Sequence, residues 1–250
     1  MDPLQIGITV TSVMMFMIFF GMRVAFASAL AGTAGLVWIL STKLGLEKAM
    51  FAGLGMAGTI PHSKAVTYAL SILPMFILIG FLAFHAGLTK SLFEAAKRWL
   101  GRLPGGLAVA TVFATAGFAA VSGASTATAA VFARVAIPEM LKEGYNRRLA
   151  AGVVAAGGTL ATLIPPSAIL VIYAIIVEES VGQLLLAGFL PGIVSALIYG
   201  LIIVSIVSFK PEMGPKTRIY SFKEKMVSLP ATVPIFSVII IIFGSMYFGW

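Results

Sequence analysis

The sequence predicts an all-α polytopic membrane protein, with about six transmembrane helices and one re-entrant helical hairpin. Of its 250 residues 60% are hydrophobic and only 10% are charged, whereas a soluble domain carries about 25% charged residues. Two polar, helix-breaking sequences, 121–128 and 157–167, interrupt the apolar runs. Within the membrane, a backbone can lose its helical hydrogen bonds only where it is buried in protein or lines a polar cavity.

The charge and the cysteine content of the chain exclude several kinds of function. The net charge of +8 comes from Lys and Arg that lie at the ends of apolar runs, so it indicates membrane topology and predicts no nucleic-acid partner. The chain has no cysteine, which excludes disulfides and Cys metal sites. Its first apolar run has neither a basic start nor a small-residue cleavage site, so it is predicted to be a span rather than a signal peptide.

The first third of the chain predicts two spans and a polar connection. The spans cover 4–21 and 24–40, with a tight turn at 21–23 between them. The Gly-rich connection 41–66 is expected to be a loop that carries one short surface helix, 47–56.

A third span and an amphipathic helix follow. The span covers 68–86, and Pro74 near its start predicts a kink. Residues 90–99 alternate apolar and charged side chains, which is typical of an amphipathic helix, here expected at the membrane interface.

The hairpin is predicted from residues 107–140. As one straight helix they would be roughly 50 Å long, against a hydrocarbon core of about 30 Å. Divided at Ser122-Gly123, each arm is too short for a full span. Basic residues flank both ends, which places both ends in the cytoplasm; they are Arg98, Arg102, Lys142, Arg147 and Arg148. Two full spans would satisfy the same charge pattern, but the short arms and polar tip favour a re-entrant hairpin.

The second arm holds an arginine close to an acidic residue. Arg134 is expected to reach the membrane interface or to pair with Glu139.

The last third predicts a broken span, two further spans and a basic connector. The broken span covers 149–177, where Pro165 and Pro166 remove two backbone donors. The next span covers 184–209, and the last covers 229–247 after the basic stretch 210–225. With these spans, most Lys and Arg lie on one side of the membrane, which is therefore predicted to be the cytoplasmic side, and the N-terminus lies on the other, periplasmic side. Only three lysines fall on the periplasmic side: Lys43, Lys48 and Lys64.

Several motifs carry a resemblance to a known family. They are Ser122-Gly123-Ala124-Ser125, Gly157-Gly158-Thr159-Leu160, Ile164-Pro165-Pro166-Ser167 and Ala187-Gly188-Phe189-Leu190-Pro191-Gly192. In this order and spacing they resemble the large membrane subunit (M subunit, large permease) of tripartite ATP-independent periplasmic (TRAP) transporters. The sequence departs from the family at Ala124, where a second Ser is common, and at Ala161-Thr162, which replaces a Gly-aliphatic pair.

The resemblance implies half of an inverted-repeat, elevator-type transporter. Members of the family contain two repeats, and this sequence is similar to the N-terminal one. Residues 1–88 are then scaffold-like spans, and 89–209 form half of the transport domain. Residues 210–250 form an interfacial connector and a final span, before the second repeat begins.

The resemblance also implies a function. It is secondary active import of a small organic acid (a carboxylate), coupled to a sodium gradient, in a bacterial or archaeal inner membrane. The implied partners are a small membrane subunit of about four spans, a periplasmic substrate-binding protein and the lipid bilayer, with sodium as coupling ion and no other cofactor.

The residues of the two breaks support sodium as the coupling ion. No Asp, Glu or Lys lies at mid-membrane depth, whereas a proton relay needs an acid or a His there. Hydroxyls and freed carbonyls suit Na⁺, and half-helix N-termini suit a carboxylate. The predicted sodium site is Ser122, Gly123, Ser125, Gly158, Thr159 and Ser167, and the predicted substrate site is Ser125, Thr126, Pro165 and Pro166. Both predictions require the two breaks to meet near mid-membrane.

Other function classes remain as alternatives. A non-transporting scaffold half, or a channel-like protein that needs a second chain, would share the same spans. An enzyme is not predicted: a serine protease needs a His beside its nucleophile, and neither His62 in the connection nor His85 at a span end is placed at the depth of Ser122.

Overall fold

A computed structural model describes residues 3–66, 70, 72–215 and 220–248, and every regular element in them is a helix. The chain divides into two compact units, Met1–Thr67 and Tyr68–Trp250. Parts of two predicted segments, the start of the third span and the middle of the basic stretch, lie outside the described residues. The all-α prediction is confirmed for the described part of the chain.

The described residues of the first unit form three helices. They are α1 (Pro3–Phe19), α2 (Val24–Leu44) and α3 (Leu46–Ala65). The expected loop at 41–66 is wrong, because α2 continues to Leu44 and α3 occupies nearly all of the remainder. Gly45, with a φ of +79°, separates the two helices, and Gly53 lets α3 pack closely on Val37 of α2. The sequence does not predict the full length of α3, because this segment is Gly-rich and contains Pro61.

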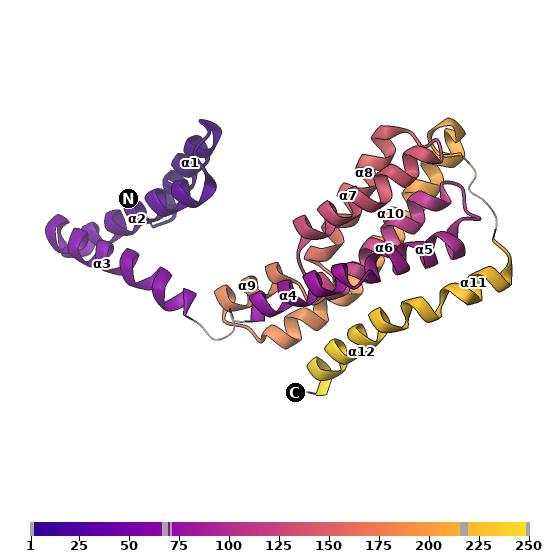
Figure 1. Cartoon of the computed structure of the whole chain (residues 1–250). Coiled ribbons are helices and arrows are strands. Elements are labelled where there is room, and N and C mark those ends of the chain that lie inside the picture. Colours follow the sequence, from indigo (N-terminus) through magenta and orange to yellow (C-terminus); the bar gives the residue numbers. More distant parts are fainter. Residues whose placement is uncertain (1–2, 67–69, 71, 216–219, 249–250) are drawn as a thin grey trace. The chain divides into compact units, whose positions relative to one another are not determined.

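The second unit is built around α6 (Gly106–Ser122), whose residues are almost all buried. It contacts six other helices of this unit, which surround it in Figure 1. They are α4 (Ile72–His85), α5 (Leu88–Leu100), α7 (Ser125–Lys142), α8 (Arg147–Thr159), α10 (Val181–Phe209) and α12 (Val233–Phe248). Alanine, threonine and glycine make up much of α6, and such small side chains let helix backbones approach closely.

The predicted break at Ser122-Gly123 is confirmed as the turn between α6 and α7, while the re-entrant position of this hairpin in a membrane stays a prediction. Gly123 ends α6 with a φ of +62° and donates its N–H to the Ala119 carbonyl, and Ala124 is extended. Glycine adopts this left-handed conformation without the steric cost that a Cβ brings. At the base, the Leu107 N–H donates to the Tyr145 hydroxyl at 3.2 Å, so the start of α6 and the end of α7 lie at the same end of the unit.

The amphipathic helix is confirmed as α5, with one face packed on α6, while its expected position at the membrane interface stays a prediction. Leu92 packs against Gly117 of α6, and the carbonyls of Leu100 and Gly101 pack against Gly106. The helix therefore runs antiparallel along α6, and its buried face includes Phe93 and Lys97. The axes of Ile77–His85 and Leu88–Leu100 differ by 69°, which makes α4 and α5 a bent pair.

Lys97 joins α5 to the end of α7. Its ammonium lies 2.6 Å from Glu139 and 3.5 Å from Glu143, and its side chain is only 8% exposed. The prediction that Glu139 could pair with Arg134 is wrong, because Glu139 binds Lys97 instead. Arg134 is exposed, which fits the alternative that it extends outward.

The predicted break within 149–177 is confirmed, while its role as a membrane span stays a prediction. α8 ends at Thr159, a 3₁₀ turn η2 (Leu160–Thr162) follows, and α9 (Ala168–Val177) begins after the Pro165-Pro166 pair, which is joined by a cis peptide bond. The next predicted span is α10, a single helix with Pro191 inside it.

The basic connector ends in a short helix, α11 (Phe222–Ser228), which starts at a capping box between Ser221 and Glu224. A 3₁₀ turn η4 (Pro230–Thr232) leads from it into α12.

In the part of the chain that the structure describes, three helical stretches are long and apolar enough to cross a membrane: Val24–Leu44, Val181–Phe209 and Phe222–Ser245. The bent α4–α5 pair would add a fourth. Shorter apolar helices cover Leu4–Phe19, Gly106–Ser122 and Ala168–Val177. The coarse prediction of a polytopic helical membrane protein is therefore supported, while the arrangement with about six spans stays a prediction.

Candidate functional site

The two breaks meet, as the sequence analysis required. The N–H of Ala168, directly after the second break, donates to the carbonyl of Gly123 at the hairpin tip, at 3.1 Å. A Cβ added to Gly158 would lie 3.4 Å from the Ser125 carbonyl oxygen and 2.7 Å from the Ala129 Cβ. The end of α8 therefore touches the start of α7, and the start of α9 touches the tip.

Two adjacent glycines make this close approach possible. Gly157 faces Thr115 of α6, with no room for a Cβ between them, and Gly158 faces Ala129 of α7. Since both positions are buried, any larger side chain there would separate α8 from one arm of the hairpin.

The hairpin tip holds a buried pair of hydroxyls. Ser122 Oγ lies 2.7 Å from Thr128 Oγ1, and both side chains are buried. This hydrogen bond links the last residue of α6 to the first turn of α7. Gly80 of α4 packs directly on the Ser122 backbone: a Cβ there would lie 2.8 Å from the Ser122 Cα.

The second break is closed by its own hydroxyls. Ser167 Oγ donates to the Thr162 carbonyl at 2.8 Å and accepts the Leu170 N–H at 3.4 Å, so it caps α9. Thr162 Oγ1 donates to the Thr159 carbonyl at 2.7 Å. Thr159 Oγ1 donates to the Ala156 carbonyl and lies 3.3 Å from the Tyr199 hydroxyl of α10.

Four helix ends converge in this region. α6 and the α8–η2 segment end there, and helix C-termini carry partial negative charge and unpaired carbonyls. α7 and α9 begin there, and helix N-termini carry partial positive charge and unpaired N–H groups. Such an arrangement provides carbonyl oxygens for a cation and N–H groups for an anion.

The predicted site residues lie in this region, but they differ in burial and in hydrogen bonding. Gly123, Ser125 and Gly158 come together through the contacts above, and Ser167 directly precedes Ala168. The hydroxyls of Ser122 and Ser167 already make hydrogen bonds within the protein. Thr126 and Thr159 are exposed, whereas Pro165 and Pro166 are buried. The roles of all these residues as sodium or substrate ligands stay predictions.

Sequence reasoning missed three residues that shape the two breaks. Thr128 is fully buried at the hairpin tip, Thr115 of α6 is fully buried against Gly157, and Gly80 of α4 packs on Ser122. Thr128 belongs to the hydroxyl-rich break itself and could have been chosen. Thr115 and Gly80 lie in ordinary apolar helices, so no local signal marks them.

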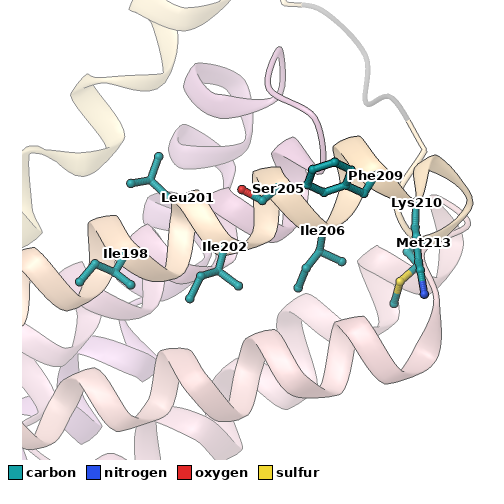
Figure 2. A pocket seen from close by; sticks show the side chains of 8 residues that line it. All are labelled: Ile198, Leu201, Ile202, Ser205, Ile206, Phe209, Lys210 and Met213. Carbon is teal, nitrogen blue, oxygen red and sulfur yellow. The ribbon is translucent and has the colours of Figure 1, made fainter.

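The hollows in the second unit are mainly apolar. One of about 140 Å³ lies between α4 and the hairpin tip, and Phe84, Phe118 and Ser122 are among its walls. Figure 2 shows another, of about 480 Å³, along the C-terminal half of α10, where Ser205 and Lys210 are its polar side chains. Neither hollow offers several polar groups to a carboxylate. Among the described residues, no three His, Asp or Glu side chains gather as they would around a divalent metal.

Comparison with known proteins gives a family match over nearly the whole chain. The family model of the tripartite ATP-independent periplasmic transporter, DctM component, matches residues 11–250. The C4-dicarboxylate TRAP transporter large permease protein DctM of Pseudomonas aeruginosa is 37% identical over 182 residues, which are 73% of this chain and 42% of the relative. The sialic acid TRAP transporter large permease protein SiaM of Vibrio cholerae is 30% identical over 240 residues, which are 93% of this chain and 52% of the relative.

A relative with a different named substrate is also similar. The isethionate TRAP transporter permease protein DctMQ of Oleidesulfovibrio alaskensis is 34% identical over 162 residues, which are 62% of this chain and 26% of the relative. The chain spans about half the length, or less, of these relatives.

Proposed function

Because this chain belongs to the DctM family of TRAP transporter large permeases, we propose that it forms the N-terminal half of a permease that imports a small organic acid with sodium. The family is one of transport permeases, so the chain is not an enzyme. The relatives' names give C4-dicarboxylates, sialic acid and isethionate as their substrates. All three are organic anions, which makes a small organic anion the proposed substrate class.

The observation that carries this proposal is the contact between the two breaks. The Ala168–Gly123 hydrogen bond and the Gly158–Ser125 approach bring two interrupted helices together inside a helical unit. Transporters bind substrate and coupling ion where interrupted helices face each other.

Sodium is proposed to bind at the negative ends of α6 and α8–η2. The carbonyl of Gly123 accepts one hydrogen bond and keeps a second lone pair for an ion. Ser122, Ser125, Gly158, Thr159 and Ser167 complete the proposed set. Side-chain and backbone oxygens of this kind are neutral, which suits a monovalent cation better than a divalent one that needs carboxylates.

The substrate carboxylate is proposed to bind at the start of α7. No side chain caps this helix at Ala124, so its first N–H groups are available to an anion. Ser125 and the exposed Thr126 would add hydroxyl donors. Buried Pro165 and Pro166 hold the second break open, and we assign them a role in shaping the site rather than in direct contact.

The other parts of the assembly are proposed from family membership. They are a small membrane subunit, a periplasmic substrate-binding protein and a bacterial inner membrane with the N-terminus outside. The segments 1–88, 89–209 and 210–250 are proposed to act as scaffold, half of the transport domain, and connector with final span.

Topology can be tested with single cysteines, because the chain has none of its own. We expect Arg102→Cys and Arg147→Cys to react with a membrane-impermeant maleimide only from the cytoplasm, since both residues are exposed at the base of the hairpin. Ser63→Cys should react only from the periplasm. Labelling of positions 102 and 147 from opposite sides would disprove the re-entrant hairpin.

Sodium coupling can be tested with the complete permease and its partners in proteoliposomes. We expect uptake of the cognate organic acid to require a sodium gradient. Ser122→Ala and Ser125→Ala should each raise the sodium concentration for half-maximal uptake about fivefold to tenfold. Each substitution removes one oxygen ligand, and the loss of one such interaction costs about 1 kcal/mol of binding free energy or slightly more.

Ser205→Ala serves as the control, since Ser205 lies on α10 in the hollow of Figure 2. It should leave the sodium dependence unchanged. Uptake that is independent of sodium in the unsubstituted permease would overturn the coupling proposal. An unchanged sodium dependence in both tip variants would remove these two serines from the ion site.

A further inference from the structure

An apolar groove runs along the hairpin arm α6 beside α12. Its volume is about 670 Å³, and α5, α6, α10, η4 and α12 line it. Six of its larger side chains are Trp99, Phe113, Ile164, Phe189, Leu229 and Phe236. Almost all of the lining is hydrocarbon, so the groove suits an apolar occupant.

Cations gather at one end of the groove, where Trp99 and Leu229 form its walls. Lys225 Nζ lies 5.9 Å from the centroid of the Trp99 ring. The neighbouring Arg98 guanidinium donates to the Glu224 carbonyl at 3.2 Å. Both cations therefore stand beside the mouth, on α5 and α11.

The groove has the depth of one membrane leaflet. Along η4 and α12 its lining runs from Leu229 to Ile239, which at 1.5 Å per residue is about 15 Å. This is half of the roughly 30 Å hydrocarbon core. An acyl chain that enters at the cationic mouth would reach the middle of the bilayer.

We propose that this groove binds one anionic phospholipid, with an acyl chain in the groove and the phosphate on Lys225 and Arg98. The combination of an apolar cleft and cations at its mouth matches the two parts of such a lipid. A protein segment would satisfy the two cations only if it carried a carboxylate at that end of the cleft, whereas an anionic phospholipid always joins an apolar chain to a phosphate, which is why a lipid is the favoured occupant. This site is separate from the hairpin tip, where the proposed transport function is placed.

The test uses the complete permease, purified in detergent with equal amounts of phosphatidylglycerol and phosphatidylcholine, and native mass spectrometry. We expect one retained phosphatidylglycerol and no selectively retained phosphatidylcholine. Lys225→Gln should lower phosphatidylglycerol retention about fivefold, the effect of one basic residue on an anionic membrane lipid. Ala96→Phe should abolish it by filling the groove, since Ala96 lines it.

Two matched controls make the result specific. Lys210→Gln removes a cation from the hollow in Figure 2, and Ala151→Phe places a ring on an exposed position of α8. Both should retain phosphatidylglycerol as the unsubstituted permease does. Equal losses for Lys210→Gln and Lys225→Gln would overturn the proposal, because the binding would then follow total charge. Equal retention of both lipids, or of neither because protein fills the groove, would also overturn it.

Discussion

Gly158→Ala is expected to raise the sodium concentration for half-maximal uptake about tenfold. The added Cβ would lie 2.7 Å from the Ala129 Cβ, which is closer than two such carbons can pack, so α7 must move away from α8. Overpacking of this kind costs about 1–3 kcal/mol, and each 1.4 kcal/mol is a factor of ten in an equilibrium constant. The loss should appear in sodium affinity, because the displaced helix carries Ser125.

Gly152→Ala provides the matched control on the same helix. A Cβ there meets no atom within 4 Å, and both substitutions raise helix propensity by about 1 kcal/mol. Gly152→Ala should therefore keep normal uptake and a normal sodium dependence. Sodium titration of uptake in both variants, at equal amounts of permease in the vesicles, is the measurement. A normal response in Gly158→Ala would mean that α7 can shift without disturbing the ion site.

The sequence was most informative where polar residues interrupt apolar helices. Gly123 and the Pro165-Pro166 pair marked both breaks, because a left-handed turn and missing backbone donors have local causes that a sequence displays. Their meeting was predicted from depth alone, and the Ala168–Gly123 hydrogen bond shows it. The family resemblance rested on the same motifs and is confirmed by the family match.

Other features depend on contacts between distant segments and could not be predicted. The sequence predicts a loop at 41–66 because its glycines and Pro61 lower helix propensity, whereas packing of Gly53 on Val37 stabilises α3. The sequence predicts an interfacial amphipathic helix over 90–99 and gives no sign that Lys97 is buried. Its burial depends on Glu139 and Glu143, which follow more than forty residues later. Gly80 and Thr115 gain their roles only from the neighbours that the fold supplies.

The Lys97 ion pair leads to the second large expected effect, which is on stability. Replacing both partners, Glu139→Gln with Glu143→Gln, leaves the ammonium of Lys97 with an 8% exposed side chain and no carboxylate. Uncompensated burial of a charge costs about 3–5 kcal/mol. Because the two carboxylates are 30% and 40% exposed, the site is partly hydrated, and we expect about 2–3 kcal/mol. The midpoint of thermal unfolding should fall by about 5–10 °C.

The reciprocal substitution should cost much less. Lys97→Met fills the same space with an apolar chain and leaves two carboxylates that water can reach, so we expect a loss of about 1 kcal/mol or less. Thermal unfolding of the purified permease, followed by tryptophan fluorescence, compares the two variants. An equal loss in both would mean that the attraction itself stabilises the base of the hairpin. A much larger loss in the double variant would show that the two carboxylates mainly neutralise Lys97, which the packing of α5 on α6 buries. The ion pair would then be a consequence of this helix packing rather than its cause.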